Sequence, residues 1–254
     1  MVRMVAMDLD DTLMRDDKTV SELSLRVLER LRVSDIKTVF ATGRSKKSAL
    51  SMTPPEYFDG MVFQNGAVVY ADNELIYIRL ISATDTRKIA KQAEAIGIKV
   101  VAETDKTHYA NANLKGYIDW ISSYEEVDFN LVDVSAEQIM LRVLRPSDLQ
   151  FLEAALPNTV YYEHGRENYV QIMQREATKL NGILALCNYY DIPIEDVVAF
   201  GDDTNDMSMM SGCGKGIAMG NAIPLIKDIA DEICDTNQND GMAKYIMENI
   251  LQEE

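Results

Sequence analysis

Cysteine, histidine and positive charge are all scarce in this chain. Its 254 residues include three cysteines and two histidines, and 25 lysines and arginines stand against 41 aspartates and glutamates, for a net charge of −16. The cysteines, Cys187, Cys213 and Cys234, are widely spaced, odd in number and form no Cys-x-x-Cys pair. We therefore expect reduced thiols rather than a disulfide framework or a cysteine zinc site, and a cytoplasmic protein.

Long apolar runs are also missing. Asp8 interrupts the apolar N-terminal stretch, so a signal peptide is not expected. No run approaches the roughly 20 apolar residues of a transmembrane helix. The acidic balance argues against nucleic acid or an anionic membrane as a partner. A small anionic molecule stays compatible with this charge, because the local potential of a pocket matters more than the total. A monomer and a homodimer both stay open.

Apolar residues make up 47% of the chain, which is enough for a sizeable core. Up to about residue 70, strand-like and helix-like patterns alternate. Strands are predicted at 2–7, 37–41, 61–64 and 67–70, with helices from Ser21 and at 45–52. Asn65-Gly66 is a turn signal between the last two strands. The alternation predicts an α/β fold with a doubly wound, Rossmann-like parallel sheet.

The middle of the chain has a different pattern. Helices are predicted at 84–96 and 147–155, and short strands at 99–103, 108–111, 139–144, 159–163 and 169–173. After residue 178 the α/β pattern resumes, with strands at 197–200 and 216–219 and a last helix at 242–251. We therefore predict a core built from residues 1–80 and 178–254, interrupted by a smaller inserted α+β domain at 81–177. Trp120 in the insert is predicted to be a core or interface residue.

Two acidic clusters directly follow apolar strands. Asp8-Leu9-Asp10-Asp11-Thr12 follows the strand at 2–7, and Gly201-Asp202-Asp203-Thr204-Asn205-Asp206 follows the strand at 197–200. In an open α/β sheet, ligands sit beyond the carboxyl ends of the strands. Carboxylates pooled there repel one another unless a cation neutralises them, and oxygen ligands suit Mg²⁺. A lone acidic turn is more often simply solvated, but two such clusters predict a Mg²⁺ site for phosphate chemistry.

Two further segments carry groups suited to a phosphate. Thr42-Gly43-Arg44 follows the strand at 37–41 and offers a hydroxyl and backbone N–H groups at the start of a helix. Lys179 lies near a helix start, where a cation opposes the helix dipole, so a role in holding a phosphate oxygen is plausible. Each signal is weak by itself, because a plain turn or a surface lysine has the same pattern.

Together these segments resemble the four ordered motifs of haloacid-dehalogenase-like phosphatases. The position of the insert between the second and third motifs is similar to that of the Cof-type sugar-phosphatase branch. Two patterns near the end of the chain also resemble this branch. They are Gly216-Ile217-Ala218-Met219-Gly220-Asn221-Ala222 and Asn239-Asp240-Gly241. One departure is Asp11, where the branch usually has glycine. Aspartate tolerates left-handed backbone conformations, so we expect the site to survive this change.

The resemblance implies a role for each motif residue. Asp8 is the implied nucleophile, and Asp10 the implied general acid and base. The implied Mg²⁺ ligands are Asp8, the Asp10 carbonyl and Asp202, with Asp206 in or beside the outer shell. The implied phosphate-binding residues are Thr42, Gly43, Lys179 and Asn205.

The expected function is a Mg²⁺-dependent phosphatase that acts on a small phosphorylated metabolite, such as a sugar phosphate, through an aspartyl-phosphate. A phosphomutase and a non-catalytic binding protein on the same scaffold are the alternatives. The inserted domain is expected to select the substrate. His108 and His164 both lie in it, and either a substrate contact or an ordinary polar role is open for them.

Overall fold

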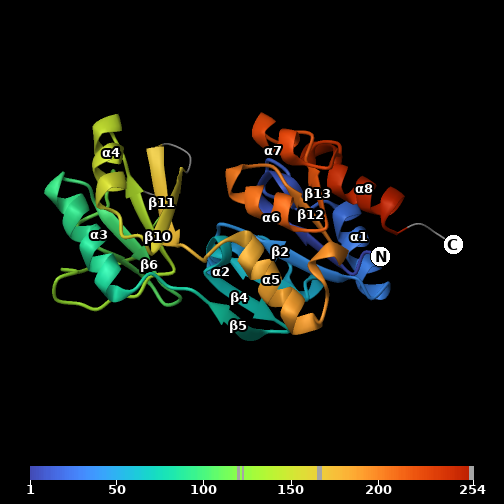
Figure 1. Cartoon of the computed structure of the whole chain (residues 1–254), viewed down its shortest axis with the longest axis horizontal. Coiled ribbons are helices and arrows are strands. Elements are labelled where there is room, and N and C mark those ends of the chain that lie inside the picture. The colour runs from blue at the N-terminus through green and yellow to red at the C-terminus, as the bar shows by residue number, and fades with distance from the viewer. Residues whose placement is uncertain (119–120, 122, 165–167, 252–254) are drawn as a thin grey trace. The chain divides into compact units, whose positions relative to one another are not determined.

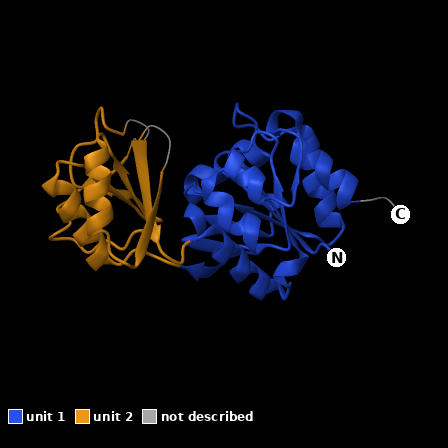
Figure 2. Ribbon diagram, turned by 45° about the horizontal axis from the view of Figure 1, so that its top comes forward, with its two compact units in different colours: residues 1–78, 178–254 blue, residues 79–177 orange. Residues whose placement is uncertain are grey.

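The computed structural model describes residues 1–118, 121, 123–164 and 168–251, so Trp120 lies outside the described residues. The chain divides into two compact units, shown in different colours in Figure 2. The core unit joins Met1–Ile78 to Thr178–Glu254, and the inserted unit is Arg79–Ala177.

The core unit is built on one mixed sheet. In the described part of the chain it has eight strands, in the order β14-β13-β12-β1-β2-β3-β4-β5. They are β1 (Met4–Met7), β2 (Lys37–Ala41), β3 (Gly60–Phe63), β4 (Val68–Ala71), β5 (Glu74–Ile78), β12 (Val197–Gly201), β13 (Lys215–Ala218) and β14 (Glu232–Ile233). Figure 1 labels β13, β12, β2, β4 and β5 of this sheet. The strands from β14 to β3 pair in parallel, as predicted.

At one edge, the parallel sheet continues into two antiparallel strand pairs. The β3–β4 and β4–β5 pairs are antiparallel. The chain reverses in the short turn at Gln64–Gly66, at the predicted Asn65-Gly66 signal. Strand β5 was not among the predicted strands; it is apolar from Leu75 to Ile78 but mostly exposed.

The helices of the core unit include two whose starts are fixed by a capping side chain. The α-helices of this unit are α1 (Glu22–Val33), α2 (Lys46–Leu50), α5 (Lys179–Tyr190), α6 (Met207–Gly212), α7 (Pro224–Ile229) and α8 (Gly241–Asn249). Ser21 caps α1, since its side chain accepts a hydrogen bond from the Ser24 amide, and Thr178 caps α5 in the same way through the Asn181 amide. None of the described helices is long and apolar enough to cross a membrane.

Strand register brings the two acidic clusters together. Every residue of β1 and β12 is buried, as expected for strands covered on both faces. The two strands are parallel neighbours, with Met7 opposite Phe200. The chain beyond each strand therefore leaves the sheet at the same edge, and the Asp8 amide donates a hydrogen bond to the Phe200 carbonyl, 3.0 Å away.

The inserted unit has the predicted α+β composition. Its sheet follows the order β10-β11-β9-β6-β7-β8, with β6 (Val100–Glu103), β7 (His108–Ala110), β8 (Glu125–Glu126), β9 (Gln138–Arg142), β10 (Val160–His164) and β11 (Tyr169–Gln174). Helices α3 (Ala83–Ala95) and α4 (Pro146–Ala155) supply Ile89 and Leu152 to a core shared with Ile139 and Ile172. The unit thus has a hydrophobic core of its own.

Candidate active site

A buried lysine joins the two acidic clusters. The Lys179 Nζ lies 2.5 Å from Asp8 Oδ1 and 2.5 Å from Asp206 Oδ1, and the Lys179 side chain is fully buried. Burial alone would lower the pKa of Lys179, but the two carboxylates outweigh it, so the pKa is raised and the ammonium stays charged. The interpretation of Lys179 as an ordinary surface lysine is therefore wrong.

Asp8, Asp202 and Asp206 form a compact carboxylate triad. One oxygen from each residue lies within 4.8 Å of the other two. Thr12 Oγ1 donates a hydrogen bond to Asp202 Oδ1 at 2.9 Å, a contact that the sequence did not indicate. Burial, and then the charge of Asp206, raise the pKa of Asp202 to about 7. With Lys179 as the cation among three carboxylates, the triad keeps excess negative charge, which fits a divalent cation bound through oxygen.

Asp206 is the most constrained member of the triad. Its Oδ1 accepts from Lys179, and its Oδ2 accepts from the backbone amides of Asp202, at 2.8 Å, and Asp203, at 3.1 Å. A Cβ on Gly201 would lie only 2.6 Å from the Asp206 carboxyl carbon, so glycine is required there. Both Asp206 oxygens thus already hold protein donors.

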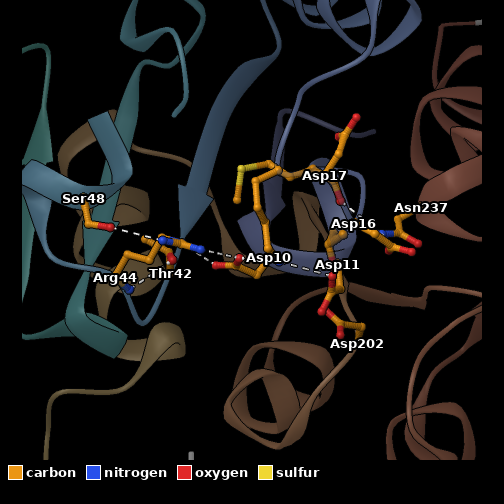
Figure 3. Close-up of polar contacts among 12 residues, drawn as sticks. Asp10, Asp11, Asp16, Asp17, Thr42, Arg44, Ser48, Asp202 and Asn237 are labelled. Carbon is orange, nitrogen blue, oxygen red and sulfur yellow. Dashed lines mark hydrogen bonds and ion pairs between the residues drawn. The ribbon is translucent and has the colours of Figure 1, made fainter. Parts of the chain in front are cut away.

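The Asp10 carboxylate contacts two cationic side chains, those of Arg44 and Lys18. Arg44 donates to both Asp10 oxygens, from Nε at 2.6 Å and from the terminal nitrogen at 2.7 Å (Figure 3). Lys18 Nζ lies 2.9 Å from Asp10 Oδ1. Burial alone would raise the pKa of Asp10, but the bonds from Arg44 and Lys18 outweigh it, so the pKa is lowered. Arg44 was part of a motif, whereas Lys18 gave no sequence signal.

Thr42, Gly43 and Asn205 come together beside this cluster. Thr42 Oγ1 accepts a hydrogen bond from the Arg44 amide at 3.1 Å. A Cβ on Gly43 would lie 3.2 Å from Asn65 Oδ1 and 3.7 Å from Asn205 Nδ2. The structure therefore gathers every predicted site residue of the core unit at one edge of the sheet. It also adds Asn65, which the sequence indicated only as a turn residue.

The four ordered motifs lie together in the fold, and the chain also matches the sequence model of a known family. Residues 5–246 match the model of the haloacid dehalogenase-like hydrolases. The chain belongs to this family. The chain is also 26% identical over 266 residues to the 5-amino-6-(5-phospho-D-ribitylamino)uracil phosphatase YitU of Bacillus subtilis, covering 96% of each chain.

Solved structures with the same fold include two that cover nearly the whole chain. TM0651 from Thermotoga maritima is 26% identical, with a TM-score of 0.84 over 100% of this chain and 99% of that one. The haloacid dehalogenase subclass IIB sugar phosphatase BT4131 is 22% identical, with a TM-score of 0.83 over 97% and 98% of the two chains. The resemblance to the Cof-type branch and the α/β core are confirmed, and the comparisons agree with the prediction of a phosphoric monoester hydrolase.

Asp11, where the Cof-type branch usually has glycine, has a left-handed backbone with φ of +58°. That conformation is the one in which glycine is least strained, and aspartate is among the residues that tolerate it. The Asp11 carbonyl accepts a hydrogen bond from Asn221 Nδ2 at 2.7 Å, and Lys18 Nζ lies 3.4 Å from Asp11 Oδ1. The expected departure from the haloacid dehalogenase-like pattern therefore leaves the turn intact.

The two histidines belong to the inserted unit of this hydrolase. His108 Nε2 lies 3.0 Å from Glu103 Oε1, across the β6–β7 pair. His164 is exposed, and its ring packs edge-on against Tyr162. These contacts give each histidine a partner within its own sheet, and both alternatives, a substrate contact and an ordinary polar role, stay open.

Proposed function

We propose that this chain is a Mg²⁺-dependent phosphatase that hydrolyses a small phosphorylated metabolite, such as a sugar phosphate, through an aspartyl-phosphate on Asp8. The observation that carries the proposal is the compact carboxylate triad of Asp8, Asp202 and Asp206, with the buried Lys179 paired to Asp8 and Asp206. Positioning and charge neutralisation are what phosphoryl transfer requires of a protein.

The proposed metal ligands are the carboxylates of Asp8 and Asp202 and the backbone carbonyl of Asp10. The Asp10 carboxylate is engaged by Arg44, and both Asp206 oxygens hold protein donors, which supports a role for Asp206 beside the ion rather than on it. When bound, Mg²⁺ would reduce the repulsion between the anionic nucleophile and the anionic phosphate.

The chain's own residues would carry two chemical steps. An Asp8 oxygen attacks phosphorus, the bond from phosphorus to the leaving alcohol breaks, and protonated Asp10 gives its proton to that alcohol's oxygen. A water molecule then attacks the aspartyl-phosphate, Asp10 takes the water's proton, and the bond from phosphorus to Asp8 breaks. Thr42, Gly43, Lys179 and Asn205 would bind the phosphoryl oxygens during both steps.

The choice of substrate is assigned to the inserted unit, because the core residues above bind only phosphate and metal. YitU, which this chain resembles over nearly its whole length, is named for a phosphorylated ribitylamino-uracil, and BT4131 for sugar phosphates. Both names support a small phosphorylated metabolite as the substrate class.

The test is release of inorganic phosphate from a panel of phosphorylated metabolites and an aryl phosphate. EDTA should abolish the activity, and added Mg²⁺ should restore it. Asp8→Asn should lose turnover and phosphate incorporation, because an amide is a far poorer nucleophile than a carboxylate. Asp228→Asn, which removes the same charge from an exposed site on α7, is the matched control and should keep activity.

The same assay separates the alternatives. A phosphomutase would need a bisphosphorylated sugar for turnover and would release little free phosphate. A non-catalytic binding protein would release none with any substrate. Full activity in metal-free buffer would contradict the proposed metal site.

A further inference from the structure

The turn between β3 and β4 is strained and buried beside the proposed phosphate site. Gln64, Asn65 and Gly66 all have positive φ values, +47°, +55° and +109°. Gln64 and Asn65 are also almost fully buried. Non-glycine residues persist in such conformations only where their surroundings hold them, and they concentrate at functional sites.

The backbone of this turn is bonded to two of the motif segments. The Asn65 amide donates to the Thr42 carbonyl at 2.9 Å, and the Gln64 amide donates to the Arg44 carbonyl at 3.0 Å. A Cβ on Gly66 would lie 2.1 Å from the Thr178 carbonyl oxygen. The turn therefore holds the Thr42–Arg44 segment and touches the start of α5, which carries Lys179.

The side chain of Asn65 reaches a third motif. Its Oδ1 accepts a hydrogen bond from Asn205 Nδ2 at 3.0 Å. Its Nδ2 is buried and has no hydrogen-bond partner among the described residues. That nitrogen lies 3.5 Å from where a Cβ of Gly43 would stand. A buried donor without a partner is costly, so the hydrogen bonds of the Asn65 side chain itself do not explain its place at the site.

We propose that Asn65 is a further positioning residue of the phosphate site, which turns the Asn205 amide toward the bound phosphoryl group. The inference rests on the proposed phosphatase function. Because Asn65 Oδ1 takes one hydrogen of the Asn205 amide, the rotation of that amide is fixed and its other hydrogen is left for phosphate. None of the four motifs contains Asn65, and only the fold brings it to the site.

The decisive variant is Asn65→Gly. It removes the amide while glycine tolerates the positive φ, so the turn itself is not strained. Asn73→Gly is the matched control, because Asn73 also has a positive φ, +68°, but is exposed in the β4–β5 turn. Thermal unfolding of both variants checks that they are folded.

Two readouts are needed, the kcat/KM for an aryl phosphate and the Kd for inorganic phosphate with Mg²⁺. Asn65→Gly should lower kcat/KM and weaken phosphate binding by about tenfold or more, the effect of losing a well-oriented hydrogen bond to a charged group. Asn73→Gly should change neither. If Asn65 acts through Asn205, Asn65→Gly in an Asn205→Ala background should add less than about twofold.

The inference would be overturned if the kcat/KM and the phosphate Kd of Asn65→Gly both stay within about twofold of wild type. It would also be overturned if the losses from Asn65→Gly and Asn205→Ala are additive in the double variant. If the wild-type protein binds phosphate but hydrolyses no monoester, the proposed function fails, and the binding measurements alone decide the role of Asn65. If the wild type hydrolyses monoesters and Asn65→Gly does so at the same rate, the inference about Asn65 fails while the proposed phosphatase function stands.

Discussion

Asp10 is held in its ionised form by the bidentate contact with Arg44 and by Lys18. That form suits the second proposed step, in which Asp10 accepts a proton from water. The first step needs the protonated form. An anionic substrate that competes for Arg44 would raise the pKa of Asp10 and favour that form.

We expect Asp10→Asn to slow the first step most when the leaving alcohol is poor. The loss of kcat/KM on an alkyl phosphate should be about 10²- to 10⁴-fold, and smaller on an aryl phosphate, whose leaving group needs less protonation. Asp17→Asn, an exposed carboxylate on the same loop, serves as the control and should change neither rate by more than about twofold. Equal losses of Asp10→Asn on both substrates would argue against Asp10 as the general acid.

Helix α5 positions Lys179, and it does so by packing closely on the sheet. A Cβ added to Gly182 would lie 2.5 Å from a Val62 methyl carbon of β3. The glycine therefore sets the distance between α5 and the sheet. A helix-interior glycine is normally unfavourable, which makes this close approach the reason for its presence.

We expect Gly182→Ala to lower the free energy of unfolding by about 1–2 kcal/mol, because the steric cost exceeds the gain of about 1 kcal/mol in helix propensity. Denaturant unfolding measures this directly. In a Val62→Ala background the same substitution should be neutral or stabilising, since the clashing methyl groups are gone. An equal loss in both backgrounds would show that the contact with Val62 is not the cause.

For the whole molecule, the acidic triad links stability to pH and to metal. The pKa of Asp202 is about 7 in the folded protein, well above that of about 4 in an unfolded chain. Between these values the folded protein holds a proton that the unfolded chain releases. The triad therefore lowers the stability of the metal-free protein as the pH rises through this window.

Magnesium ion should offset this loss, because it replaces the proton among the carboxylates. We expect the rise in Tm on adding Mg²⁺ to be larger at about pH 8 than at about pH 5, as measured by thermal unfolding. In Asp202→Asn most of this difference should disappear. The same Mg²⁺ effect at both pH values would contradict the site.

The division into two units also makes a prediction for the whole chain. Each unit has its own buried core, so replacing residues 79–177 with a short linker should leave a folded core unit. That protein should keep weak Mg²⁺-dependent activity on a small aryl phosphate and lose discrimination among sugar phosphates. If it folds and still ranks sugar phosphates as the full chain does, the inserted unit does not select the substrate. An unfolded product would place the boundary elsewhere.

The sequence by itself determined many of the elements, and the family. Apolar runs mark β1, β2 and β12, and Ser21 and Thr178 mark the starts of two helices, because these signals act within a few residues. The order of the motifs around Asp8, Thr42, Lys179 and Asp202 indicated the site, since acids and phosphate-binding groups after parallel strands meet at one edge.

Only the tertiary structure decided how these groups contact one another. Lys179 had the pattern of a surface residue, but strand order buries it between carboxylates from two distant segments. The contacts from Arg44 to Asp10 and from Asn205 to Asn65 likewise join segments far apart in the chain. Burial and hydrogen bonding depend on which strands become neighbours, and local sequence patterns do not encode that.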